Sequence, residues 1–348
     1  MAKVIGTDAE ARRALASGLA EYNFAVHQPS DPPLFTRVPK PSMVPCHWKA
    51  SDIAHWLEEI GRSVKLEAGG VRRTLRLTNP GLEWGTTPTF WASIQYILPG
   101  EIATAHRHAA SALRFIMQGE GANTIVEGES YPFEVGDLVL TPKWTFHDHE
   151  HCGDKPMIWL DVLDVSLVRN FDAVFFDGYD EPRSPIGEDP QRSMLEYGSG
   201  LMRPRNAPPA PPVNPLLVYP RAMARKAVLD AAQLPPHPFY DTAMDYRSPS
   251  DGGPAMKTLG TMLQRLRPGS KLDAFRHTGS CVYYVIEGQG QSQIDDHVFE
   301  WGTGDFIAIP SWARQQHSNH SDSEDAWLFQ VNDIPALKAL DLWREEPA

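Results

Sequence analysis

Three histidines in the N-terminal half of the chain have the residue type and spacing of metal ligands. His106 and His108 form a His-x-His pair, and His147 follows further along. Side chains on a strand alternate between its two faces, so both imidazoles of the pair share one face. A hairpin that folds back can bring the third imidazole to them. Three neutral nitrogen ligands keep the full charge of a divalent metal and leave positions vacant, which suits an anionic chelating substrate and O₂ meeting on one iron.

The ligand type alone does not identify the metal, because imidazole binds Fe, Zn, Cu and Ni. A closed structural zinc site would need four protein ligands, and only three histidines stand at suitable positions. Vacant coordination positions favour catalysis. On these grounds an iron-dependent oxygenase and a zinc-dependent hydrolase both remain open.

Glycine and proline residues around the histidines follow the two motifs of the cupin barrel. The first motif, G-x₅-H-x-H-x₃₋₄-E-x₆-G, is matched by Gly100, His106, His108 and Gly119. The second motif, G-x₅-P-x-G-x₂-H, is matched by Gly136, Pro142 and His147. There are two departures: Trp144 replaces the inner glycine of the second motif, and Ala112 or Leu113 occupies the glutamate position. The acidic fourth ligand usual in this barrel is therefore missing.

An arginine lies close to the position of the missing glutamate. Arg114 follows Ala112 by two residues, so on a strand the two side chains share a face. If Ala112 faces the metal, Arg114 does too. A buried guanidinium without a partner is costly, so either a nearby Asp or Glu pairs with it or a substrate carboxylate does. The fork of guanidinium donors matches a carboxylate at two points, and we favour the substrate carboxylate.

The same alternation marks two candidates after the third histidine. His149 shares a face with His147, so it could serve in acid–base chemistry or hydrogen bonding; a surface histidine is the alternative interpretation. Asp161 ends the segment PMIWLD and could orient His149 or Arg114.

Two groups before the histidines complete the candidate site. One of two alternating sets lines the barrel: Trp91, Ser93 and Gln95, or Phe90, Ala92 and Ile94. Core packing is the simpler interpretation of Trp91. A basic run is formed by Arg72, Arg73 and Arg76. It is either a solvated strand face or a clamp for an anionic substrate.

The chain contains an internal repeat. PGEIATAHRHAASALRFIMQGEG resembles PGSKLDAFRHTGSCVYYVIEGQG, and GDLVLTPKWTF resembles GDFIAIPSWAR. The matching glycine, proline and tryptophan positions are offset by 168 or 169 residues, which predicts two copies of one barrel. In the second copy Phe275 and Gln315 stand at two ligand positions, and only His277 keeps its imidazole, with His317 as a potential shifted ligand. We therefore expect a structural second barrel.

Short segments rich in aromatic and branched residues, broken by Gly or Pro, predict antiparallel β-structure from residue 86 onward. The expected fold is mainly β: a bicupin with two double-stranded β-helix (jelly-roll) barrels and flanking helices. A capping box at Thr7 and a cap at Ser51 predict two helices near the N-terminus. The expected regions are a partly helical segment (1–85), the metal-binding barrel (86–175), a proline-rich linker or arm (176–245), the degenerate barrel (246–335) and a C-terminal helix (336–348).

Composition and charge argue against several classes of protein. The 348 residues are 42% hydrophobic and 22% charged, as in soluble globular proteins, and the net charge of −12 disfavours nucleic acid or an anionic membrane as a partner. No run approaches the length of a membrane span, and acidic residues stand where a signal peptide would be apolar. The three cysteines are odd in number, without C-x-x-C spacing, which fits a reducing compartment. We expect a cytoplasmic protein.

The runs AHRHAASALRFIMQGEGANTIVEGE and WTFHDHEH, with NPGL before the first barrel, resemble the gentisate 1,2-dioxygenases and the related ring cleavers of salicylate and 1-hydroxy-2-naphthoate. The resemblance covers most of the chain. It implies Fe(II) on His106, His108 and His147, a substrate carboxylate on Arg114, and catalytic groups at His149, Asp161 and Gln95. The substrate-binding residues we expect are Arg114, Trp91, Ser93, Arg72 and Arg76. At Ser93 we would expect a smaller apolar residue against the ring.

The activity implied is the conversion of gentisate and O₂ to maleylpyruvate by a homotetrameric enzyme. Salicylate and 1-hydroxy-2-naphthoate are alternative substrates. An isomerase or decarboxylase on the same scaffold would usually keep the glutamate. A non-catalytic or regulatory bicupin would tolerate erosion of the three histidines, yet only the second barrel is eroded.

Overall fold

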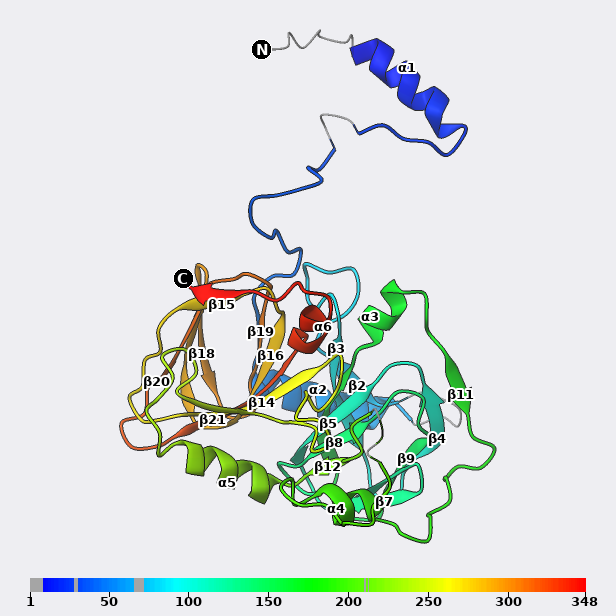
Figure 1. Ribbon diagram of the computed structural model, residues 1–348, viewed down its shortest axis with the longest axis vertical. Helices are drawn as coiled ribbons and strands as arrows, with labels where there is room; N and C mark the ends of the chain where they lie inside the picture. Colours follow the sequence, from blue (N-terminus) through cyan, green and yellow to red (C-terminus); the bar gives the residue numbers. More distant parts are fainter. Residues whose placement is uncertain (1–8, 28–30, 66–71, 210, 212) are drawn as a thin grey trace. The chain divides into compact units, whose positions relative to one another are not determined.

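The structure, a computed structural model, describes residues 9–27, 31–65, 72–209, 211 and 213–348. It divides into two units, residues 1–40 and 41–348. The first unit contains helix α1 (Ala9–Ala20), and the capping box expected at Thr7 lies outside the described residues. The second unit holds the two barrels (Figure 1). None of the helices in the described parts of the chain is long and apolar enough to cross a membrane.

The first barrel consists of two antiparallel sheets. One has the strand order β12-β8-β5-β10-β3-β2, and the other has the order β11-β4-β9-β6-β7. Their bounds are β2 (Thr74–Arg76), β3 (Trp91–Ile97), β4 (Ile102–His108), β5 (Ala112–Gln118), β6 (Ala122–Val126), β7 (Glu129–Pro132), β8 (Leu138–Thr141), β9 (His147–His151), β10 (Met157–Leu163), β11 (Phe176–Gly178) and β12 (Val218–Tyr219). The three ligand histidines lie on the five-stranded sheet, and Arg114 lies on the larger, six-stranded sheet.

The second barrel repeats this arrangement. Its sheets have the orders β1-β19-β16-β21-β14-β13 and β18-β17-β20-β15-β22. The bounds are β1 (Cys46–Trp48), β13 (Thr242–Asp245), β14 (Gly260–Leu266), β15 (Phe275–His277), β16 (Cys281–Glu287), β17 (Gln289–Ile294), β18 (His297–Gly302), β19 (Phe306–Ile309), β20 (Gln315–Asn319), β21 (Ala326–Asn332) and β22 (Glu345–Pro347). Strand β16 follows β5 by 169 residues, and β20 follows β9 by 168. The predicted bicupin fold is confirmed.

The larger sheets of the two barrels pack against each other. The outward-facing side chains of both sheets form one apolar cluster, in which Phe115 of β5 stacks on Phe329 of β21 at 4.2 Å between ring centroids. Tyr284 of β16 meets Phe115 edge-on. Aligned sheets bury such alternating apolar faces efficiently. This packing leaves the inner face of each larger sheet free to line its own barrel.

Helices flank the barrels. Their bounds are α2 (Ala50–Ser63), α3 (Val165–Asn170), α4 (Arg192–Tyr197), α5 (Arg221–Ala231) and α6 (Ile334–Ala339). The cap predicted at Ser51 is wrong, because Lys49 is the N-cap of α2. Asp305 from the second barrel accepts a hydrogen bond from the Ala50 N–H at 2.7 Å. The C-terminal helix is shorter than expected, because residues 345–347 leave it to pair with β15.

Short edge strands extend both barrels beyond their expected ranges. β2 precedes residue 86 and pairs with β3, while β11 and β12 from the expected linker pair with β4 and β8. β1, from the N-terminal region, joins the second barrel. Two or three residues carry too little alternation to predict a strand. Their pairing depends on a neighbouring edge that only the folded chain provides.

Candidate metal centre and substrate cavity

The three predicted ligands converge inside the first barrel. His106 and His108 extend from β4 and His147 from β9, and these antiparallel strands place His106 opposite His147. One nitrogen from each ring lies within 4.8 Å of the others. Ring centroids are 4.3 Å apart for His106 and His147, and 4.9 Å apart for His108 and His147. Of the residues that the structure describes, only these form such a group of three potential ligands.

Each imidazole is oriented by a backbone carbonyl two residues away. The Nδ1 atoms of His106, His108 and His147 lie 2.8, 2.7 and 2.9 Å from carbonyl oxygens of Thr104, Ala110 and Thr145. A proton on Nδ1 that is donated to the carbonyl leaves Nε2 with a free lone pair. The Nε2 atom of His147 is buried and has no hydrogen-bond partner. These residues therefore fit a metal ion held through three Nε2 atoms.

Burial keeps the three ligands neutral. Desolvation, followed by the charge of Arg72, lowers the pKa of His106 to about 3. Desolvation is also the main cause that lowers the pKa of His108 and holds that of His147 well below its ordinary value, with Arg114 the next cause for His147. Neutral imidazoles are the form that binds metal.

A tryptophan with a left-handed backbone fixes the position of His108. Trp144 stands where the cupin motif has glycine, and its φ is +60°. Its N–H donates to the carbonyl of His108 at 2.9 Å. In the second barrel Trp312 has φ +64° and donates to the carbonyl of His277 in the same way. The turn conformation has thus been kept in both copies although the glycine has not.

Arg114 lies buried beside the ligands and has two protein partners. Its Nη1 donates to the Thr141 Oγ1 at 2.6 Å, and its Nε lies 3.6 Å from the Asp161 Oδ1. That distance makes an ion pair but no hydrogen bond, and both atoms lack a hydrogen-bond partner. Burial raises the pKa of Asp161, and Arg114 opposes the shift. Asp161 is therefore the acidic partner of Arg114, and the guanidinium keeps a donor without a hydrogen bond.

His149 lies beside the ligands without belonging to their group. Its ring is 6.1 Å from that of His147 and is packed between Phe133 and Trp159, each at 5.5 Å. Its Nδ1 is buried without a partner. Burial, followed by Arg114, holds the pKa of His149 well below its ordinary value. The ring is a neutral imidazole with free hydrogen-bonding capacity at the cavity.

A cavity of about 660 Å³ opens beside these groups. Trp91, Ser93 and Gln95 line it from β3, whereas Ala92 and Ile94 are buried in the apolar cluster between the barrels. Ser93 donates its hydroxyl to the Asp161 carbonyl at 3.4 Å. The Trp91 Nε1 is buried without a partner. The set with Trp and Gln thus faces the cavity.

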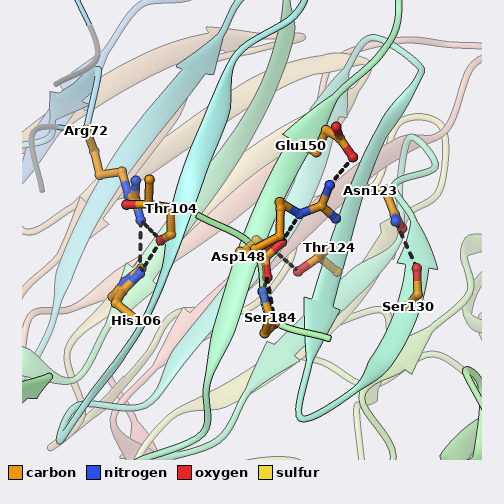
Figure 2. Close-up of polar contacts among 10 residues, drawn as sticks. Arg72, Thr104, His106, Asn123, Thr124, Ser130, Asp148, Glu150 and Ser184 are labelled. Carbon is orange, nitrogen blue, oxygen red and sulfur yellow. Dashed lines mark hydrogen bonds and ion pairs between the residues drawn. The ribbon is translucent and has the colours of Figure 1, made fainter. Parts of the chain in front are cut away.

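The side chains of the basic run, which leads into β2, point in two directions. Arg72 and Arg76 line the cavity, and the Arg72 Nη2 lies 2.9 Å from both the Thr104 carbonyl and the His106 Nδ1 (Figure 2). The guanidinium of Arg76 lies over the Trp91 ring, 4.7 Å from its centroid. Arg73 instead makes a buried ion pair with Glu101 at 2.7 Å. Two of the three arginines therefore face the candidate site.

One wall of the cavity was not predicted from the sequence. Residues 178–182 line it, and the ring of Phe176 stacks against His106 at 5.4 Å. This stretch belongs to the expected linker. Its only signal in the sequence is the aromatic run VFFDGY directly after the first barrel.

The second barrel replaces the ligand group by a hydrogen-bonded interior. The His277 Nε2 and the Gln315 Nε2 are 3.1 Å apart, and the His317 Nε2 lies 3.4 Å from the Gln315 Oε1. The Ser292 hydroxyl lies 2.8 Å from the His317 Nδ1. No third ligand joins the two histidines among the residues described, so His317 does not complete a metal site.

Fold and site together define a metal-binding bicupin with one ligand group and an arginine-lined cavity. The model of the cupin domain matches residues 93–163 and 262–331. The gentisate 1,2-dioxygenase 1 of Aquipseudomonas alcaligenes is 38% identical over 89% of each chain, and the 1-hydroxy-2-naphthoate 1,2-dioxygenase of Nocardioides sp. (strain KP7) is 35% identical over 89% of this chain and 80% of that one. The crystal structure of the salicylate 1,2-dioxygenase from Pseudaminobacter salicylatoxidans superimposes with a TM-score of 0.91 at 30% identity, covering 98% of this chain and 99% of that chain.

The chain belongs to the gentisate 1,2-dioxygenase family of ring-cleaving bicupin dioxygenases. It is accordingly an oxidoreductase with a metal cofactor.

Proposed function

We propose that this protein is an Fe(II)-dependent dioxygenase that converts gentisate and O₂ to maleylpyruvate. One observation carries the proposal: three neutral imidazoles form one ligand group, and two of them, His106 and His108, line the same cavity as a buried guanidinium. Relatives named as gentisate 1,2-dioxygenases support the choice of substrate. A salicylate 1,2-dioxygenase of the same fold has been crystallised with gentisate, which supports it further.

His106, His108 and His147 would hold the iron. Bound Fe(II) supplies vacant coordination positions and the redox chemistry through which an aromatic ring reacts with O₂. The absence of a carboxylate ligand leaves the metal with a larger net charge, which favours an anionic hydroxy acid. This donor set suits Fe(II), and measuring the bound metal tests the assignment.

The residues of the cavity bind and orient the acid. Arg114 is the anchor for the substrate carboxylate, because its guanidinium is buried and keeps an unused donor. Asp161 holds Arg114 in place through the 3.6 Å ion pair. Arg72 and Arg76 add further positive charge to the cavity lining, and Trp91 offers a flat surface to the ring. Gln95 supplies an amide for a ring hydroxyl.

His149 is the residue that we assign to proton transfer. Its pKa is depressed by burial, so the imidazole is neutral and can accept a proton from the substrate hydroxyl. Burial of its Nδ1 atom limits the access of water to this nitrogen. We assign the second barrel a structural role, since its equivalent histidines are engaged with Gln315 and Ser292.

We also propose that the enzyme is a cytoplasmic homotetramer. The cysteines Cys46, Cys152 and Cys281 are all free, which suits a reducing compartment. Phe171, Phe175 and Phe176 are exposed close together in sequence, and apolar patches of this kind commonly mark interfaces. Light scattering of the purified protein tests the subunit number.

The proposal is tested by anaerobic loading with Fe(II), followed by O₂ consumption and product absorbance with gentisate. We expect stoichiometric O₂ uptake and a new absorbing product. If O₂ is consumed faster with salicylate or 1-hydroxy-2-naphthoate than with gentisate, that acid is the preferred substrate instead. Absence of O₂ uptake with all three acids in iron-loaded protein would overturn the proposed function and favour a binding or regulatory bicupin.

A further inference from the structure

A segment beyond the predicted barrel forms one wall of the cavity. Residues 178–184, here called the strap, begin at the last residue of β11 and continue beside β4. The Tyr179 N–H donates to the Ala105 carbonyl at 3.1 Å, and the Ala105 N–H donates to the Pro182 carbonyl at 2.8 Å. Ala105 directly precedes the ligand His106. The strap is therefore paired with the strand that carries two of the three ligands.

The far end of the strap is fixed to the neighbouring strand β9 (Figure 2). The Arg183 Nε donates to the Asp148 Oδ1 at 2.5 Å, and Ser184 donates both its N–H and its hydroxyl to the Asp148 Oδ2, at 2.8 and 2.6 Å. The Arg183 Nη1 forms an ion pair with Glu150. One guanidinium thus bridges two carboxylates on the same face of β9.

Asp148 occupies a special position on β9. It lies between His147 and His149, and strand alternation directs it to the opposite face. Its side chain is fully buried, although it is a carboxylate on the outer face of the barrel. A buried carboxylate is tolerated only when charged and hydrogen-bonding partners surround it, and Arg183 and Ser184 are those partners. The strap therefore supplies what Asp148 requires.

We infer that Asp148, Arg183 and Ser184 form a clip that positions the strap as a wall of the substrate cavity. The clip touches neither the metal ligands' nitrogens nor the cavity itself. It acts through the strap, whose residues 178–182 face the cavity. Without the clip, the strap would keep its two backbone hydrogen bonds to Ala105, and the next backbone hydrogen bond along the chain would be the one from the Gly187 N–H to the Gly128 carbonyl. The identity of the bound acid rests on the proposed function; the clip does not.

Hydrogen–deuterium exchange and steady-state kinetics of Arg183→Gln test the clip. Charge-assisted hydrogen bonds would be lost, so we expect strap amides to exchange about ten- to a hundredfold faster and the KM for gentisate to rise by about tenfold. Iron content and kcat should change by less than about threefold, because the ligands keep their carbonyl partners. Arg192→Gln removes an exposed ion pair with Glu196 on α4 and is the matched control. It should change neither the exchange of the strap amides nor the KM for gentisate.

A conservative variant separates positioning from general stability. Arg183→Lys keeps the charge but cannot bridge Asp148 and Glu150 together. The exchange rate of its strap amides and its KM for gentisate should therefore fall between those of wild type and Arg183→Gln. Unchanged strap exchange in Arg183→Gln, or faster exchange with an unaltered KM, would overturn the inference. If wild type turned over no gentisate, the proposed function would fail alone, and the exchange rates would still decide whether the clip holds the strap.

Discussion

Asp333 of the second barrel accepts a hydrogen bond from the hydroxyl of Thr89 in the first barrel, at 2.7 Å. The reverse contact also exists: Asp164 of the first barrel accepts one from Thr258 of the second. Thr258 follows Thr89 by 169 residues, and Asp333 follows Asp164 by the same number. Each barrel thus contributes one threonine and one aspartate to a pair of equivalent contacts.

These two contacts give the barrel–barrel interface the pattern of a two-fold symmetric dimer within one chain. Each carboxylate is also held by a backbone N–H in its own barrel, from Ser111 to Asp164 and from Ser280 to Asp333. Only the first barrel adds a cation, since Lys143 lies 2.9 Å from Asp164. The two contacts fix the orientation of the barrels. They differ because, among the described residues, Asp164 has a neighbouring cation and Asp333 does not.

The pH dependence of stability should depend on Asp333. Burial raises its pKa to about 6, above the 3.8 of an unfolded aspartate. Between these values the folded protein binds a proton that the unfolded chain does not, so this group's contribution to stability is full below pH 3.8 and is lost as pH rises through 6. Asp333→Asn removes the titration and keeps an acceptor for Ser280. The variant should therefore gain in melting temperature relative to wild type between pH 5 and pH 7.5.

The matched control for that measurement is Asp164→Asn. It loses the ion pair with Lys143, so it should be less stable than wild type at pH 7.5. A constant difference in melting temperature between wild type and Asp333→Asn from pH 5 to pH 7.5 would show that Asp333 does not titrate in this range.

Metal binding should depend on His108 but not on its counterpart in the repeat. His108→Ala removes one of three ligands and should abolish iron retention and turnover together. His277→Ala removes the equivalent imidazole of the second barrel, which contacts Gln315, and should retain iron. Metal analysis after gel filtration, with O₂ uptake, makes the comparison. Equal iron loss in both variants would refute the assignment of the metal to the first barrel.

Affinity for the aromatic acid should depend on Arg114. Arg114→Ala should weaken binding of the aromatic acid by about 2–5 kcal/mol, as expected for a buried charge pair. The loss should appear mainly in KM, with iron content unchanged. Arg114→Lys keeps the charge but loses the fork, so it should recover only part of the affinity. An unchanged KM for gentisate in Arg114→Ala would remove this residue from carboxylate binding.

The size of the side chain at Ser93 should influence the choice of substrate. Its hydroxyl makes one long hydrogen bond of 3.4 Å, so Ser93→Ala should change kcat/KM for gentisate by less than about fivefold. Ser93→Val adds bulk to the cavity wall and should penalise 1-hydroxy-2-naphthoate more than gentisate. O₂ uptake with both acids gives the ratio of kcat/KM for gentisate to kcat/KM for 1-hydroxy-2-naphthoate. A ratio that is the same in both variants would show that Ser93 does not limit the space for the ring.

Much of the site was accessible from sequence because strands alternate with a period of two. That rule places His106 with His108, and Trp91 with Ser93 and Gln95, without knowledge of the fold. It also sets Arg73 apart from Arg72 and Arg76. The rule could not choose a partner for Arg114, since an aspartate and a substrate carboxylate both satisfied the charge. The contact with Asp161 at 3.6 Å depends on β5 pairing with β10.

The sequence by itself determined the ligand residues, the missing glutamate and the duplication, because motif spacing and repeat offsets are properties of the linear chain. Only the tertiary structure decided that the expected linker contributes the strap, that Arg183 joins Asp148, and that Thr89 meets Asp333. These contacts link residues far apart in the chain through hydrogen bonds and charge. No local periodicity encodes them, because their free energy arises only when separate strands bury the groups together.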